Sequence, residues 1–138
     1  MMKKMLSVFI CLLLASAAFG SWETVKGPVD YNNPSDAVAL NATTVLKVSG
    51  NTVTKTTNFG ESWTDIALPE GVTLRAIDAA NETVVYACGD DGLVYKSTNA
   101  GDTWTQVGDT ANYTVRLEVI DVYDADNVFI GGRDGNFL

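Results

Sequence analysis

Paired carboxylates are the residues of this sequence whose types and spacing could most directly perform chemistry. Asp90 is followed by Asp91, and one residue separates Asp124 from Asp126. Two carboxyl groups can serve a glycosidase, and an oxygen-rich loop can bind calcium. However, Asp91 precedes Gly92 as in a tight hairpin turn, and the later Glu of a calcium loop is missing. The sequence therefore predicts turns at both places, with no catalytic and no metal-ligating residue.

Cys88 is the only cysteine after the first twenty residues, and its thiol is a candidate nucleophile. The chain contains no histidine, which excludes a Ser-His-Asp triad, a Cys-His pair and the usual zinc sites. Because Cys88 lies in an apolar stretch with strand character, it is predicted to be a buried small hydrophobe. No cofactor is predicted.

Five aromatic residues could form a binding face for sugars or peptides. They are Tyr86, Tyr95, Tyr113, Tyr123 and Phe129. Tyr86 and Phe129 occupy equivalent positions in two similar segments, so both are expected in the core. Tyr113 and Tyr123 lie near strand ends or loops, where exposure is expected.

The charge balance restricts the partners. The chain has 138 residues, 46% of them hydrophobic, with 9 Lys and Arg against 17 Asp and Glu. Two of the lysines lie in the first twenty residues, which leaves 7 basic against 17 acidic residues. Such a surface repels phosphate groups, so neither a nucleic acid nor an anionic membrane is an expected partner.

Residues 1–20 have the organisation of a secretory signal peptide. Two lysines form the positive start, an apolar stretch follows, and small residues allow cleavage after Ala17 or Gly20. The apolar run Met5–Ala18 is 14 residues long, short of the roughly 20 needed by the alternative, an uncleaved membrane anchor. The sequence thus predicts an exported bacterial protein, periplasmic, extracellular or on the cell surface, that meets a membrane only during export.

A repeat of 41 residues organises the rest of the chain. Trp22, Trp63 and Trp104 are spaced by this period, and the residues around them agree. Lys55–Trp63 matches Lys96–Trp104, and a further copy of the segment that precedes these loops begins near Ile120. Such self-similarity is the signature of a repeat architecture.

Each repeat is predicted to form four short strands, which is the signature of a β-propeller blade. The predicted units are a last-type strand at 21–26, a blade at 27–67, a blade at 68–108 and an incomplete blade at 109–138. Because propellers typically close with four or more blades, the chain is expected to be part of a larger propeller. Assembly of several copies into one ring is the alternative.

The loop before the second and third tryptophans resembles the Asp-box, the bacterial neuraminidase repeat Ser/Thr-x-Asp-x-Gly-x-x-Trp. The matching residues are Thr56, Asn58, Gly60 and Trp63, and again Ser97, Asn99, Gly101 and Trp104. Both copies have Asn in place of Asp, and either oxygen can accept hydrogen bonds from loop amides. The glycine permits a positive φ, and the tryptophan can bury apolar area between blades. The expected role is structural.

The segment from Val84 to Trp104 is similar to the photosystem II stability/assembly factor family. The features in common are Gly89-Asp90-Asp91-Gly92 and then Lys96-Ser97-Thr98 before the Asp-box. The resemblance implies a propeller that helps assemble another protein and binds it through an arginine-rich face. For such a face this sequence offers only Arg75, Arg116 and Arg133.

Two functions are therefore expected. The first is an exported, non-enzymatic propeller that acts as a scaffold and binds a protein partner not identified by the sequence. The alternative is a part of a secreted sialidase-like or glycosidase-like protein that acts on or binds a glycan, with its catalytic residues outside this chain. The Arg-Ile-Pro motif of sialidases is absent. An adhesion module of a large secreted protein is a weaker third hypothesis.

Overall fold

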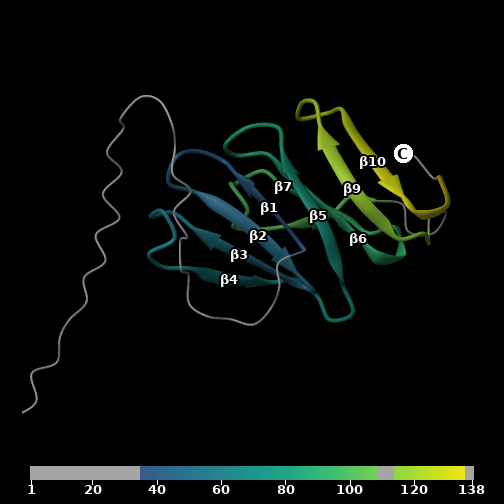
Figure 1. Cartoon of the computed structure of the whole chain (residues 1–138), viewed down its shortest axis with the longest axis horizontal. Coiled ribbons are helices and arrows are strands. Elements are labelled where there is room, and N and C mark those ends of the chain that lie inside the picture. Colours follow the sequence, from purple (N-terminus) through teal and green to yellow (C-terminus); the bar gives the residue numbers. More distant parts are fainter. Residues whose placement is uncertain (1–34, 109–113, 136–138) are drawn as a thin grey trace, which may run out of the picture.

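The computed structural model describes residues 35–108 and 114–135, where the regular elements are β-strands and two short 3-10 turns (Figure 1). The predicted signal peptide, the strand at 21–26 and Tyr113 lie outside the described residues. Within these residues, no helix is long and apolar enough to span a membrane.

Two four-stranded antiparallel sheets follow one another along the chain. The first has the order β1-β2-β3-β4, and the second has the order β5-β6-β7-β8. In the first, the strands are β1 (Asp36–Ala39), β2 (Val45–Ser49), β3 (Thr52–Thr56) and β4 (Thr64–Ala67). In the second, they are β5 (Leu74–Ala79), β6 (Val85–Gly89), β7 (Val94–Ser97) and β8 (Thr105–Gln106). The predicted order of four strands per repeat is confirmed in both.

A third sheet contains β9 (Leu117–Val122) and β10 (Val128–Gly132), paired antiparallel. The first strands of the three sheets are neighbours in space, because β5 contacts both β1 and β9. Figure 1 shows the sheets in sequence order across the molecule, from β1–β4 on one side to β9 and β10 on the other. Each sheet therefore packs face to face against the next.

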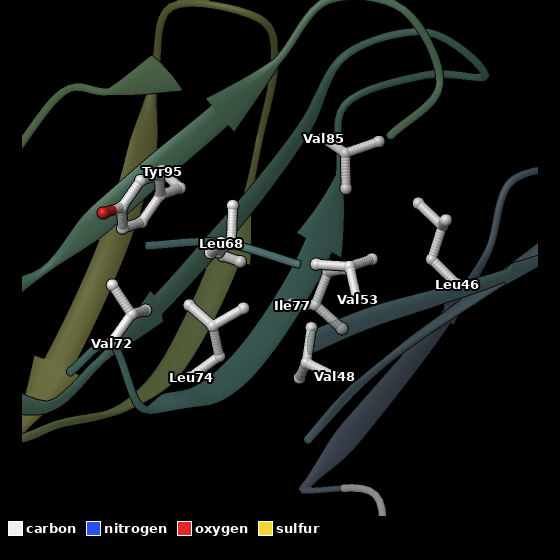
Figure 2. Packing of buried hydrophobic residues seen from close by; sticks show 10 residues of the cluster. Leu46, Val48, Val53, Leu68, Val72, Leu74, Ile77, Val85 and Tyr95 are labelled. Atoms are coloured by element: carbon white, nitrogen blue, oxygen red, sulfur yellow. The ribbon is translucent and has the colours of Figure 1, made fainter. Parts of the chain in front are cut away.

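The apolar residues fill the spaces between successive sheets. Leu46, Val48 and Val53 of the first sheet pack against Ile77 and Val85 of the second (Figure 2). A second cluster lies between the second sheet and β9–β10. Strand β6 is buried along its whole length because its sheet is covered on both faces, which explains its nearly continuous apolar sequence.

The hairpin between β6 and β7 has the turn that the sequence predicts. Asp91 and Gly92 have φ of 57° and 69°, and the Leu93 amide donates to the Asp90 carbonyl at 3.1 Å. Positive φ at both central residues defines the type I′ turn, which Asp-Gly favours. The turn holds the Asp90 side chain at the end of the sheet, next to the arginines described below.

Candidate functional site

Arg75 and Asp90 form a two-pronged ion pair at one end of the second sheet. Arg75 is the second residue of β5, and Asp90 follows β6 in the 3-10 turn Asp90–Gly92. The Arg75 Nε donates to Asp90 Oδ1 at 3.0 Å, and its Nη2 donates to Oδ2 at 2.8 Å. This bidentate geometry fixes both side chains, which a single contact between flexible groups does not.

Arg116 extends this pair into the third sheet. Its Nε donates to the same Asp90 Oδ1 at 3.0 Å, and its Nη1 lies 3.8 Å from Glu118 Oε1. Arg133 Nε then donates to that Glu118 oxygen at 3.0 Å. The result is a row of alternating charge that crosses from one sheet to the next. We call it the charged row, and its members are Arg75, Asp90, Arg116, Glu118 and Arg133.

The repeat explains the geometry of the charged row. Arg75 and Glu118 occupy the same position of successive repeats, 43 residues apart, and so do Asp90 and Arg133. The second pair has the opposite order of charges, with the carboxylate on the strand and the guanidinium on the turn. Arg116 lies between the two pairs. Its positive charge is close to both carboxylates, those of Asp90 and Glu118.

The hydrogen bonds of the row favour the ionised states of Arg75 and Asp90. Hydrogen bonding to Asp90 raises the pKa of Arg75. Hydrogen bonding to Arg75, followed by that to Arg116, lowers the pKa of the Asp90 carboxyl against the opposing effect of burial. The row contains all three arginines of the chain and two carboxylates, so it is locally cationic on an acidic protein. Arg133 is its most accessible member, with 61% of its side chain exposed.

Removing the Asp90 charge is expected to destabilise the protein, and more at neutral than at acid pH. Asp90→Asn leaves two guanidinium groups facing each other, at a cost of about 1–2 kcal/mol for a half-exposed network. Because folding lowers the pKa of Asp90, its stabilisation is present above the unfolded pKa of about 3.9 and is lost as the pH falls through the folded pKa. Urea unfolding at several pH values measures the difference between wild type and variant.

The matched control is Asp91→Asn, which removes one carboxylate from the same turn. Asn tolerates the positive φ of Asp91, and no hydrogen bond or ion pair of the Asp91 side chain occurs within the described residues. An equal loss of stability in both variants, or a difference from wild type that does not shrink in acid, would contradict the role given to Asp90.

The loop between β3 and β4 is closed by its own side chains. The Thr56 hydroxyl oxygen accepts a hydrogen bond from the Gly60 amide at 2.9 Å, and Asn58 Oδ1 accepts one from the Ser62 amide at 3.0 Å. Gly60 has φ of 84°. Strand β4 begins directly after the half-buried Trp63.

The loop between β7 and β8 repeats this arrangement. Ser97 Oγ accepts from the Gly101 amide at 2.9 Å, and Asn99 Oδ1 accepts from the Thr103 amide at 2.9 Å. Gly101 also has φ of 84°, and the half-buried Trp104 donates from Nε1 to the Gly101 carbonyl at 2.9 Å. In both loops the Thr or Ser hydroxyl and the Asn side chain bind amides of the same loop, so their chemistry is that of loop closure.

Asp124, a further candidate from the sequence, has local partners. Asp124 Oδ1 accepts from the amides of Asp126 and Asn127, both at 2.8 Å, which lowers the pKa of Asp124. Asp124 therefore closes a turn. Across residues 35–108 and 114–135, no group of three or more acidic or Cys side chains is placed to hold a metal ion.

Cys88 is fully buried, as the sequence predicts. Burial raises the pKa of its thiol to about 12, so the thiol remains protonated at neutral pH. A protonated, inaccessible thiol is not a nucleophile.

The prediction that Phe129 lies in the core is wrong. Tyr86 is buried, with 7% exposed, but the equivalent Phe129 is 58% exposed. The reason is the neighbouring sheet: β9 and the loop after it cover Tyr86, whose hydroxyl donates to the Ala125 carbonyl at 2.7 Å. Within the described residues, no sheet covers Phe129 in this way. Tyr123 is exposed, as expected.

Successive antiparallel blades, joined face to face and with their first strands side by side, define the class of protein as a β-propeller fold. No family model matches the sequence, and no curated protein matches it. Among solved structures, the chain is similar to "YCF48 bound to D1 peptide", with a TM-score of 0.65 and 14% identity over 74% of this chain and 35% of that chain. The structure of YCF48 from Cyanidioschyzon merolae also matches, with a TM-score of 0.36 and 14% identity over 72% of this chain and 48% of that chain.

The chain thus spans about a third to a half of the length of these solved proteins. At this identity the similarity concerns the fold, which confirms the expected all-β propeller architecture. The charged row was not predicted as a unit. The sequence indicates its three arginines and predicts Asp90 in a turn, but it assigns no role to Glu118.

Proposed function

We propose that this chain is a non-enzymatic propeller that acts as a protein-binding scaffold, and that the charged row binds an extended acidic segment of its partner. The observation that carries the proposal is that the three arginines of the chain gather at one end of two adjacent blades. Elsewhere the surface is dominated by carboxylates, which repel an acidic segment. The row is therefore the place where such a segment would be attracted and oriented.

The geometry of the row supports recognition of carboxylates. Asp90 already holds Arg75 and Arg116 in fixed orientations, so these guanidinium groups lose little conformational freedom when a ligand binds. Arg133 presents most of its side chain to solvent, and a planar guanidinium can pair with a carboxylate through two parallel hydrogen bonds. A solved relative in fold has been described with a bound peptide, which supports peptide recognition as the activity.

Two further parts of the proposal rest on the sequence. The organisation of residues 1–20 supports export, because a positive start and a short apolar run are followed by small residues. The resemblance of the Thr56–Trp63 and Ser97–Trp104 loops to Asp-boxes supports a structural role for these loops. The internal hydrogen bonds of Thr56, Asn58, Ser97 and Asn99 fit that role.

Fluorescence anisotropy with an array of acidic, labelled peptides tests the proposal. We expect micromolar or weaker binding that weakens with salt, and a loss of about tenfold in affinity for Arg133→Ala. The matched control is Lys55→Ala. It removes a cation of the first blade that is paired with Asp102, and it should leave peptide binding unchanged.

Binding of the same protein to a panel of glycans distinguishes the proposed function from the alternative, a glycan-binding propeller. A glycan response together with no peptide binding would contradict the proposal in favour of a glycan-binding propeller. Equal losses for Arg133→Ala and Lys55→Ala would show that general charge, rather than the charged row, attracts the peptides.

A further inference from the structure

Strands β9 and β10 lie at the edge of the molecule (Figure 1), and their outer face carries exposed apolar side chains. Val119 and Phe129 are 59% and 58% exposed, and Tyr123 is more exposed still. Phe129 pairs with Asp121, and Val119 and Tyr123 lie two residues to either side of Asp121 on the same strand face. We call this surface the β9–β10 face; it is defined by Val119, Asp121, Tyr123 and Phe129.

The repeat shows what kind of surface covers such a face. The equivalent residues of the second blade are Ala76 and Tyr86, which are buried against the third blade. The residues that cover them are apolar and belong to the first two strands of that blade, namely Leu117, Val122 and Ile130. The β9–β10 face thus has the residue pattern of an interface between blades, with the covering blade missing from the described residues.

A carboxylate on each covered face binds the backbone of the covering blade. Asp36 Oδ2 accepts from the Ile77 amide at 3.0 Å, and Asp78 Oδ2 accepts from the Val122 amide at 2.7 Å. Asp121 occupies the position of Asp78 in the next repeat. Its carboxylate lies on the β9–β10 face and has no hydrogen-bond or ion-pair partner within residues 35–108 and 114–135. It can therefore accept an amide from a covering strand.

At the opposite end of the molecule, strands β1 and β2 present the kind of face with which one blade covers the preceding blade. Ala37, Val45 and Lys47 lie on one face of β1–β2, at the positions that Ile77, Val85 and Ala87 occupy in the second blade. Ala37 is exposed, and Val45 and Lys47 are half-buried. We call this the β1–β2 face. Lys47, whose ammonium group also lies 4.9 Å from the centre of the Trp63 ring of the same blade, gives this face a positive charge. Asp121 gives the β9–β10 face a negative charge, so the two faces are complementary in charge as well as in type.

We infer that the β1–β2 face of one copy of this chain packs on the β9–β10 face of a second copy. In this arrangement Ala39, at the position of Val122, presents its amide to Asp121. The Leu40 amide donates to Thr44 on the β2 side, and successive amides of a strand point to opposite edges, so the Ala39 amide points to the edge that a neighbouring blade meets. The contact is heterologous, because two different surfaces meet. It does not depend on the charged row or on peptide binding.

Light scattering coupled to size-exclusion chromatography, over a hundredfold range of concentration, tests this inference. We expect the wild type to associate as its concentration rises. Phe129→Glu and Lys47→Glu should each weaken association by about tenfold or more, because each damages one of the two faces. Val107→Glu is the matched control: Val107 is 51% exposed on neither face and should associate as the wild type does.

Mixing the two variants distinguishes this arrangement from others. Phe129→Glu retains an intact β1–β2 face, and Lys47→Glu retains an intact β9–β10 face, so an equimolar mixture should form a one-to-one dimer that neither variant forms alone. Circular dichroism and thermal unfolding check that each variant is folded. A wild type that stays monomeric at every concentration, or variants that associate unmixed as the wild type does, would overturn the inference.

Discussion

Replacing Gly89 by alanine is expected to lower the free energy of unfolding by about 3 kcal/mol or more, because the added methyl group would collide with backbone. A Cβ at this position would lie 1.9 Å from the Thr73 carbonyl oxygen and 2.9 Å from Leu74 Cα. The backbone of Gly89 is extended, with φ of −168°, so the cost comes from the close approach and not from strained dihedral angles.

The backbone near Gly89 has little freedom to relax. The next amide, of Asp90, donates to the same Thr73 oxygen at 2.9 Å, and the Leu74 amide donates to the Gly50 carbonyl of the first blade at 2.8 Å. Moving β5 away from β6 would break these hydrogen bonds and displace Asp90 from Arg75. Gly89→Ala should therefore weaken the charged row as well as the sheet.

Urea unfolding followed by tryptophan fluorescence measures this effect, with Gly50→Ala as the control. Gly50 has φ of 55°, but a Cβ there would meet nothing within 4 Å, so its substitution should cost only about 1 kcal/mol of backbone strain. If Gly89→Ala cost no more than Gly50→Ala, the close approach would not limit stability. Gly132 tests the generality of the prediction, since it holds the same position one repeat later and a Cβ there would lie 2.7 Å from the Arg116 carbonyl oxygen.

Features that depend on residues close in the sequence could be predicted from it. The Asp91-Gly92 turn follows from the conformational preferences of two adjacent residues. The two loops before Trp63 and Trp104 place side-chain oxygens within four residues of the amides that they bind. Alternating apolar residues predicted the strands, and the repeat predicted their grouping into blades. In each case the determining contacts lie inside one repeat.

The charged row and the exposure of Phe129 depend instead on which blade lies next to which. Arg116 reaches Asp90 across 26 positions of sequence and a blade boundary, and no local pattern predicts that contact. Phe129 has the sequence environment of a buried residue, yet its exposure is decided by whether another blade covers its sheet. One indication of the charged row is visible when equivalent positions of the repeats are compared. Asp90 is replaced by Arg133 in the next repeat and Arg75 by Glu118, so the charge is reversed at both positions.

Replacing Leu46 by alanine is expected to lower the free energy of unfolding by about 3 kcal/mol, within the range of 2–5 kcal/mol for large-to-small changes in a core. Leu46 has no exposed surface and lies in the cluster between the first and second blades (Figure 2). It also lies beneath the loop between β7 and β8, because a Cβ at Gly101 would come within 2.8 Å of Leu46 Cδ1. The backbone of that loop is closed by Ser97 and Asn99, so it cannot readily collapse into the cavity.

The position of Leu46 makes a second result measurable. Since Leu46 joins two blades rather than stabilising one, Leu46→Ala should broaden the urea transition as well as lower its midpoint. Val107→Ala, at a half-exposed position, should change the free energy of unfolding by less than about 0.5 kcal/mol. A lower midpoint with an unchanged slope would mean that the blades still unfold together without this contact. In that case the hydrogen bond from Ile77 to Asp36 and the ion pair of Lys55 with Asp102, which also cross this boundary, would be sufficient to couple them.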